Sequence, residues 1–249
     1  MKKIVLIVWG IALCTLLLEA SKIPGYTPPG AEKKVKKPEL YHAIWEKMYG
    51  GEDNDIAYGI VALEEGESAI VGTCRSFNAQ YTDICVTRMD AQGEILWRLL
   101  LGGAKQDEGK AITRAADGTL MVLGTTKSLA KNYDRDLYVA KVSLEGKLIW
   151  EEGIGGDRDE FAGGIAGTDD GGTLIVGDSE SFGNNYRDIY IVKLSKEGKV
   201  VSSRTIGGEK EDSAKALTRT KDGSMVMVGH REVQSSGNKD FFVMKLDQN

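Results

Sequence analysis

The chain has 249 residues, with 37 acidic and 32 basic side chains and a formal net charge of −5 at pH 7. This acidic balance, without a basic stripe, argues against nucleic acid as a partner, because phosphate binding needs clustered Lys and Arg. The length is sufficient for one domain with a sizeable core behind an N-terminal leader.

The N-terminal region predicts export. Lys2 and Lys3 precede a mostly apolar run over residues 4–18, and Ala20 is a small residue suited to cleavage. The run is too short to span a membrane comfortably, so we expect a signal peptide over residues 1–20. The mature protein would be periplasmic, secreted or at the cell surface. The alternatives are an uncleaved anchor, the only membrane contact expected, and lipidation at Cys14.

Residues 21–43 are expected to form an extended, solvated tether. They hold all four prolines of the chain and a cluster of four lysines. Such a composition has too few apolar side chains to build a packed core. The predicted folded domain therefore covers residues 44–249.

This domain repeats one unit four times. Each copy has a glycine pair with an acid four positions after the second glycine, and the first glycines lie 52, 53 and 52 residues apart. The copies are Gly50-Gly51 with Asp55, Gly102-Gly103 with Asp107, Gly155-Gly156 with Glu160, and Gly207-Gly208 with Asp212. Trp45, Trp97 and Trp150 open three of the units at the same spacing. Self-similarity at this period is typical of a solenoid, a propeller or an array.

Each unit contains four short segments with the composition of strands. In the third unit they are 162–168, 173–177, 189–194 and 200–206, each bounded by turn residues. No stretch after residue 45 keeps a helical apolar period. Four strands in about 50 residues is the size of one propeller blade. We predict an all-β fold, a β-propeller of four blades with four antiparallel strands each, with repeats over 45–96, 97–149, 150–201 and 202–249.

The ends of the repeat region predict ring closure. The last unit stops at Leu246 without a fourth strand, and residues 44–49 are a spare copy of that strand, with Trp45 matching Trp97. We expect the N-terminal strand to pair beside the C-terminal one, which would remove two open sheet edges.

Two cysteines depart from the repeat in the same unit. Cys74 ends the second segment of unit one and Cys85 lies early in the third. If the segments form a hairpin, the two can sit opposite each other, and an exported protein can keep a disulfide. The alternative is a pair of buried thiols.

Two sets of acids recur in every unit. Asp55, Asp107, Glu160 and Asp212 could form a carboxylate ring at one mouth of a channel, where oxygen ligands suit calcium. The alternative is that each acid accepts backbone N–H bonds and holds its turn, with no cofactor. The aspartates that open the third segments are interpreted as structural: Asp83, Asp136, Asp188 and Asp240.

The loops between the second and third segments carry aromatic and amide side chains. The candidate ligand-binding residues are Phe77, Asn78, Tyr81, Asn132, Tyr133, Phe182, Asn185 and Tyr186. Loops on a rigid scaffold often carry recognition, and these residue types suit glycans or extended peptides. The alternative is that the aromatic rings cover the outer rim of each blade.

No catalytic motif is present. His42 and His230 are the only histidines, and neither has a metal-ligand spacing. There is no nucleophile elbow, phosphate loop or reactive cysteine context. A carboxylate pair for glycoside chemistry stays open, because nothing in the sequence singles one out.

The unit resembles a β-propeller-like repeat of poorly characterised exported bacterial and archaeal proteins, with the fullest match at Asp188-Ile189-Tyr190-Ile191-Val192-Lys193-Leu194. The resemblance implies export and a propeller, and it brings no active site. We therefore expect a non-catalytic propeller that acts as a binding or scaffold module for a protein or polysaccharide. The alternatives are a carbohydrate- or ester-processing enzyme that uses carboxylates at the channel mouth, and a calcium-stabilised structural module.

Overall fold

A computed structural model describes residues 42–77, 79, 81–184, 186–232 and 237–247 of the chain. The chain divides into two compact units, residues 1–44 and 45–249, and every strand belongs to the second. The predicted signal peptide and nearly all of the tether lie outside the described residues, so both stay predictions.

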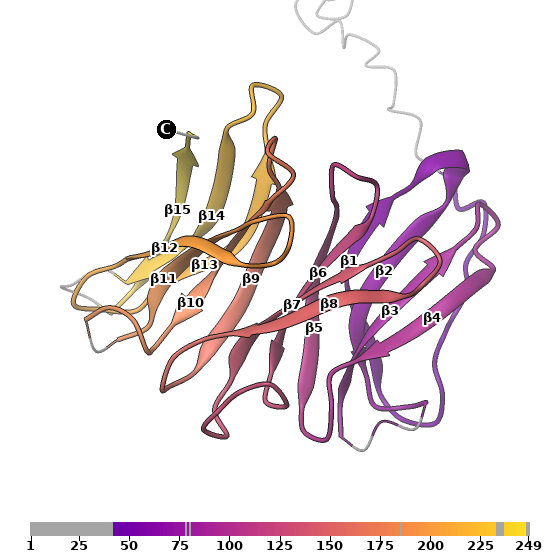
Figure 1. Cartoon of the computed structure of the whole chain (residues 1–249), viewed down its shortest axis with the longest axis horizontal. Helices are drawn as coiled ribbons and strands as arrows, with labels where there is room; N and C mark the ends of the chain where they lie inside the picture. The colour runs from indigo at the N-terminus through magenta and orange to yellow at the C-terminus, as the bar shows by residue number, and fades with distance from the viewer. Residues whose placement is uncertain (1–41, 78, 80, 185, 233–236, 248–249) are drawn as a thin grey trace, which may run out of the picture. The chain divides into compact units, whose positions relative to one another are not determined.

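The second unit is all-β, as predicted, and consists of four antiparallel sheets in a row (Figure 1). The first sheet holds β1 (Asp55–Ala62), β2 (Ser68–Cys74), β3 (Asp83–Met89) and β4 (Ile95–Leu101). The second holds β5 (Asp107–Arg114), β6 (Leu120–Thr126), β7 (Asp136–Val142) and β8 (Leu148–Ile154). The third holds β9 (Glu160–Gly167), β10 (Thr173–Ser179), β11 (Asp188–Leu194) and β12 (Val200–Ile206). The fourth holds β13 (Asp212–Arg219), β14 (Met225–Glu232) and β15 (Lys239–Leu246).

The hairpins between the third and fourth strands explain two repeat positions at once. Gly93, Gly146 and Gly198 have φ angles of 76°, 80° and 83°, a left-handed conformation that favours glycine. A tryptophan ring lies against each of these turns: Trp45 against Gly93 and, from the last strand of the preceding sheet, Trp97 against Gly146 and Trp150 against Gly198. A Cβ on Gly146, for example, would lie 2.8 Å from the Trp97 ring, whose Nε1 donates to Leu144 O at 2.7 Å.

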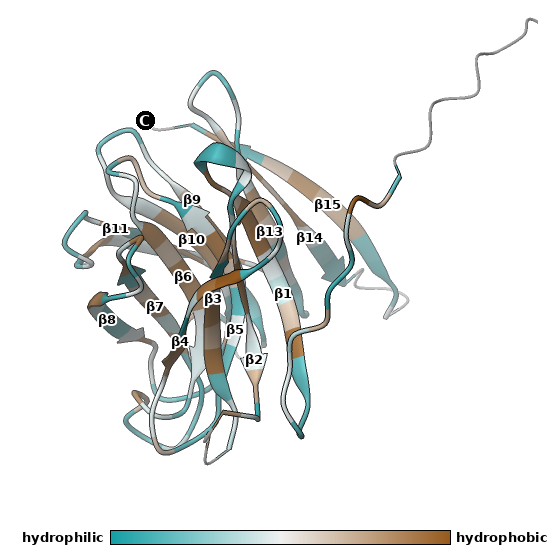
Figure 2. Ribbon diagram, turned by 90° about the vertical axis from the view of Figure 1, so that its right-hand side faces the viewer, coloured by the Kyte–Doolittle hydropathy of each residue, from teal (hydrophilic) through white to brown (hydrophobic). Residues whose placement is uncertain are grey.

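The core lies between neighbouring sheets in three clusters (Figure 2). Each cluster combines apolar side chains from one sheet with those of the next sheet along the chain. In the second cluster, Leu123, Leu137 and Val139 of the second sheet contact Ile175 and Val192 of the third. Burying a side chain of this size stabilises the fold by about 1.5–3 kcal/mol, so each junction is a substantial source of stability.

Closure of the ring is not seen in the described residues. The fourth sheet has three strands, and residues 45–49 form no strand. Trp45 instead lies over Gly93 and donates Nε1–H to Ala91 O at 3.1 Å, as Trp97 does one sheet further on. The segment is thus held on the first sheet, and the fourth sheet leaves Phe241 87% and Val243 61% exposed. The sequence shows a missing strand, but a pattern along the chain does not specify the curvature that would bring the two ends together.

Candidate functional site

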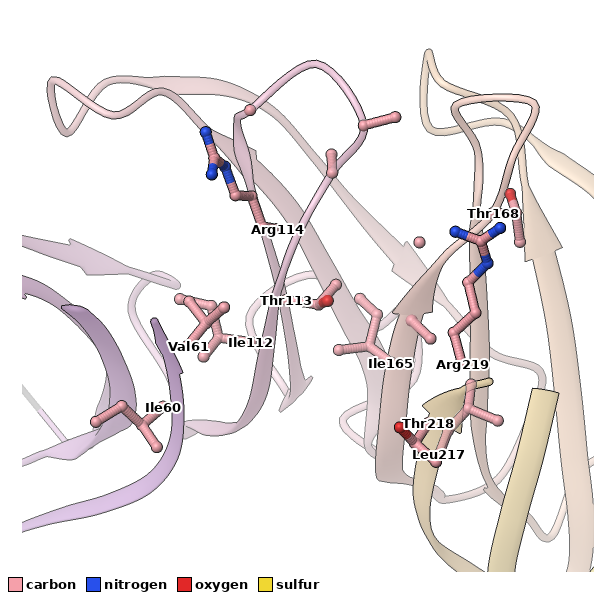
Figure 3. Close-up of a pocket in the computed structure, with 15 residues that line it drawn as sticks. Ile60, Val61, Ile112, Thr113, Arg114, Ile165, Thr168, Leu217, Thr218 and Arg219 are labelled. Atoms are coloured by element: carbon pink, nitrogen blue, oxygen red, sulfur yellow. The ribbon is translucent and has the colours of Figure 1, made fainter. Parts of the chain in front are cut away.

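The first strands of neighbouring sheets, which are β1, β5, β9 and β13, contact one another along the row. We call them the inner strands. Two pockets lie between them, one at each end. The larger, which we call the arginine pocket, has a volume of about 750 Å³ and lies where the inner strands end (Figure 3). The same repeat position of all four strands lines it with an apolar side chain: Ile60, Ile112, Ile165 and Leu217.

The polar groups of the arginine pocket are hydroxyls and two guanidinium groups. Arg114 pairs with Glu64 at 2.9 Å, and Arg219 pairs with Asp169. No carboxylate belongs to the described lining of this pocket.

The smaller pocket, which we call the glutamate pocket, has a volume of about 240 Å³ and lies toward the start of the inner strands. Each inner strand contributes to it. The contributing side chains are Tyr58, Glu108, Lys110, Phe161 and Lys215, and Arg187 joins them from the turn before β11. Glu108 is exposed and is the one carboxylate in the described lining of this pocket.

Charge and aromatic contacts arrange the walls of the glutamate pocket. The Lys110 ammonium lies 5.4 Å from the centre of the half-exposed Tyr58 ring. The Arg187 guanidinium lies 3.9 Å from the centre of the Phe161 ring and pairs with Glu180 at 3.2 Å. Both distances are within the range of a cation–π interaction. These contacts hold two aromatic rings beside the pocket without filling it.

The Lys215 ammonium lies next to the buried side chain of Asp178. Its ammonium is 3.2 Å from Asp178 Oδ2, and Asp178 also accepts hydrogen bonds from Ser213 Oγ at 2.6 Å and Ala214 N at 2.7 Å. Three donors thus surround this buried side chain, and burying a polar group is costly unless it is hydrogen-bonded. Asp178 thereby fixes the position of Lys215 at the pocket wall.

The four acids that follow the glycine pairs do not form the carboxylate ring considered for a channel mouth. They are Asp55, Asp107, Glu160 and Asp212. Each begins an inner strand and accepts an N–H bond from the second glycine of its own pair, at 2.9 Å for Asp55, Asp107 and Glu160. Asp107, Glu160 and Asp212 are buried. This geometry agrees with the alternative in which each acid holds its turn.

A calcium role for these acids stays a prediction. Within the part of the chain that the structure describes, no three His, Cys, Asp or Glu side chains are grouped so as to hold a metal ion. Across the same residues, no helix has the length and apolar character needed to cross a membrane.

The loop aromatics divide into two kinds. The Phe77 and Phe182 rings lie against Gly51 and Gly156 of the glycine pairs, which suits a packing role. The tyrosines project outward: Tyr133 is 80% exposed with Lys105 4.2 Å from its ring centre, and Tyr81 and Tyr186 are half-exposed.

Of the amides in these loops, Asn132 Nδ2 donates to Asp157 Oδ1 at 3.4 Å. Asn78 and Asn185 lie outside the described residues. The tyrosines of these loops are thus more exposed than Phe182, which is 37% exposed.

Cys74 and Cys85 lie on paired strands with Cα atoms 5.8 Å apart, and their sulfur atoms are bonded. The bond joins β2 to β3 within the first sheet. Its presence in the purified protein is a prediction that mass measurement can test.

Sequence reasoning missed the glutamate pocket. Its residues occupy the first and third positions after the turn acid, where the four units differ most. The first position reads Ile56, Glu108, Phe161 and Ser213, and the third reads Tyr58, Lys110, Gly163 and Lys215. Divergence at inner-strand positions of an otherwise regular repeat is the signal that could have identified this pocket.

No protein-family model matches the chain. A stretch of 107 residues is 27% identical to part of the regulatory protein FlaEY of Caulobacter vibrioides, covering 38% of this chain and 11% of that protein. The chain thus spans a small part of the length of the curated relative that it matches.

Among solved structures, a candidate exo-β-1,3-galactanase from Bifidobacterium bifidum s17 is similar with a TM-score of 0.50 and 10% identity, over 77% of this chain and 68% of that one. An endo-arabinase from Bacteroides thetaiotaomicron VPI-5482 has a TM-score of 0.47 and 14% identity, over 85% of this chain and 81% of that one. The likeness to the first shows a propeller-like fold.

Two expectations change with these comparisons. The prediction of a non-catalytic binding or scaffold module is wrong: the solved structure that this fold resembles with a TM-score of 0.50 is described as that of an enzyme, an exo-β-1,3-galactanase. The narrower assignment to a repeat of exported proteins has no support from a family model.

Proposed function

We propose that this chain is an enzyme that processes carbohydrate and that its substrate binds in the glutamate pocket. The observation that carries the proposal is the composition of this pocket. One exposed carboxylate, Glu108, stands among two aromatic rings and three cations, and all four inner strands contribute to the walls. Ligand sites typically combine an apolar or aromatic lining with a few convergent polar groups.

The fold comparison supports the same reading. The solved structure with a TM-score of 0.50 is that of a candidate exo-β-1,3-galactanase. A propeller-like fold with inner strands around a central pocket suits a polysaccharide chain, which needs an open approach.

Glu108 takes the reactive role in this proposal. Glycoside cleavage generally uses a pair of carboxyl groups, one that transfers a proton to the leaving oxygen and one that acts as base or nucleophile, and Glu108 would supply one of these two roles. Lys110 and Lys215 line the pocket with Glu108 and would stabilise negative charge that develops on a leaving oxygen. Tyr58 and Phe161 would present ring faces to the sugar.

The test is a hydrolysis assay on the purified full chain. β-1,3-Galactan and a panel of neutral and acidic polysaccharides are incubated with the wild type, and released reducing ends are measured. Glu108→Gln keeps the size of the side chain but removes its charge. Positioned acid–base groups contribute about 10²–10⁴-fold to rate, so we expect at least about a 100-fold loss.

Glu209→Gln is the matched control, because Glu209 is exposed and lies outside the described lining of the glutamate pocket. It should retain wild-type activity. Absence of turnover on the whole panel, or equal activity of the two variants, refutes the proposal.

Two structural proposals accompany this function. We propose export through the N-terminal segment, with release of residues 1–20. We also propose that residues 44–49 add to β15 and complete a fourth blade. Trp97 pairs with Arg88 and Trp150 with Lys141 in their ladders, so the repeat predicts Trp45 opposite Lys245. The first and last sheets already line common pockets, which supports closure within one chain.

A further inference from the structure

Each of the three junctions between neighbouring sheets brings two carboxyl groups together. The aspartate that begins the third strand of one sheet meets the acid that begins the first strand of the next. The pairs are Asp83 with Asp107, Asp136 with Glu160, and Asp188 with Asp212. A backbone bond fixes the approach, since the amide of the second acid donates to the residue before the aspartate, at 2.7–2.8 Å in every junction.

The same oxygen lacks a partner in all three pairs. Oδ1 of Asp83, Asp136 and Asp188 is buried without a hydrogen bond. Asp136 is only 5% and Asp188 only 1% exposed. A buried polar atom without a partner is costly, and natural structures contain few of them. Three occurrences at one repeat position indicate a common feature of the junctions, not a local irregularity.

The unpaired oxygen faces the second acid across a glycine. A Cβ built on Gly155 would lie 1.9 Å from Asp136 Oδ1 and 2.3 Å from Glu160 Oε2, so the two oxygens are close neighbours. At the next junction, a Cβ on Gly207 would lie 1.8 Å from Asp188 Oδ1. The first glycine of the pair therefore provides the space in which the two carboxyl groups meet.

The second acid of the pair already accepts hydrogen bonds from other donors. Glu160 accepts a hydrogen bond from Gly156 N at 2.9 Å and another from Ser179 Oγ at 2.7 Å. Its oxygens therefore act as acceptors in this network. Two adjacent buried carboxylates repel each other strongly, so one proton shared by the pair is the favourable state.

We propose that each junction holds one proton between its two carboxyl groups, and that in the first two junctions the aspartate of the third strand donates it to the acid of the following sheet. The O–H of Asp136 would then bond to Glu160, and the orphan oxygens would acquire their missing partners. This inference is independent of the carbohydrate proposal, because it uses no residue of the glutamate pocket.

The electrostatics agree at the first two junctions; at the third, burial raises the pKa of Asp212 against an opposing effect of Arg231, with a further rise from Asp188. Burial, Glu160 and Asp134 raise the pKa of Asp136 to about 6, against an opposing effect of Lys131. Burial and Asp107 likewise raise the pKa of Asp83. Asp55 has no preceding sheet in the row: burial raises its pKa, but hydrogen bonds from Gly51 and Ser76 outweigh burial and lower it.

The sign of the pH effect follows from the raised pKa. A group whose pKa is higher in the folded chain contributes stability below its unfolded pKa and loses it as pH rises through the folded value. For Asp136 the unfolded value is 3.8 and the folded one about 6. The junctions should therefore be most stable in mild acid and weaken between about pH 4 and pH 6.

The test compares thermal unfolding of the full chain from pH 4.5 to pH 8.5 in wild type, Asp136→Asn and Glu209→Gln. The amide of Asp136→Asn can donate to Glu160 at every pH. We expect its Tm to exceed that of the wild type at pH 8, with a smaller fall in Tm on going from pH 5 to pH 8. Glu209→Gln should follow the wild type.

Infrared difference spectra provide a second readout. A protonated carboxylic acid signal that is present at pH 5 and reduced in Asp136→Asn supports the shared proton. Parallel pH profiles of wild type and Asp136→Asn overturn the inference. It is also overturned if CaCl₂ raises and EDTA lowers the wild-type Tm while neither affects Asp136→Asn, because a cation then occupies the junction.

Discussion

Substitution of Phe241 by alanine tests whether the ring closes. Phe241 occupies the repeat position of Leu137, which is fully buried between the second and third sheets. In the open row Phe241 is 87% exposed. The two positions thus have the same repeat context, and only the next sheet distinguishes them.

The destabilisation expected from Phe241→Ala depends on whether the first sheet covers this side chain. Leu137→Ala should cost about 2–5 kcal/mol, the usual range for a buried leucine, and Phe241→Ala should cost about 3–5 kcal/mol if the first sheet packs on it. In an open row, Phe241→Ala should change the free energy of unfolding by no more than about 0.5 kcal/mol. For a domain of this size, about 3 kcal/mol corresponds to a fall in Tm of roughly 10 °C.

Urea unfolding of wild type and both variants measures these differences, and size-exclusion chromatography with light scattering gives the mass of the folded species. Closure within one chain predicts a monomer and a large cost for Phe241→Ala. If Phe241→Ala is silent while Leu137→Ala is costly, the closure proposal is refuted. A large cost in a dimer would mean that two chains complete one ring.

Two further outcomes are expected. Gly155→Ala should destabilise the chain by about 1–3 kcal/mol through overpacking, because the new methyl group would overlap the oxygens of Asp136 and Glu160; an unchanged urea midpoint would contradict this. Mass spectrometry of the purified protein with and without reductant should show a gain of two hydrogens on reduction at Cys74 and Cys85, and reduction should cost about 2–4 kcal/mol; two free thiols in the unreduced sample would contradict the disulfide.

The repeat made the strands of this protein predictable. Third-unit segments expected at 162–168, 173–177, 189–194 and 200–206 correspond to β9 to β12, with boundaries that differ by a few residues. Turn glycines and short apolar runs are local signals, and they recur four times, so an error in one unit is corrected by the others.

The candidate site was less accessible to sequence reasoning. The acids that stood out by their regular spacing hold turns, whereas Glu108 and Lys110 belong to positions without a repeat pattern. A residue type that recurs at the same position in all four units contributes to the fold that the units share. Residues that serve one ligand need not recur, so their meaning appears only when the inner strands are placed side by side.

The sequence alone determined that the chain is all-β, that it has four related units and where their turns fall, because those properties depend on local backbone preferences and on side chains a few positions apart. Only the tertiary structure decided which carboxyl groups meet between sheets and which aromatic rings stay exposed. Those properties depend on how one sheet is rotated against the next, and that rotation is set by the packing of side chains some 50 residues apart in the sequence.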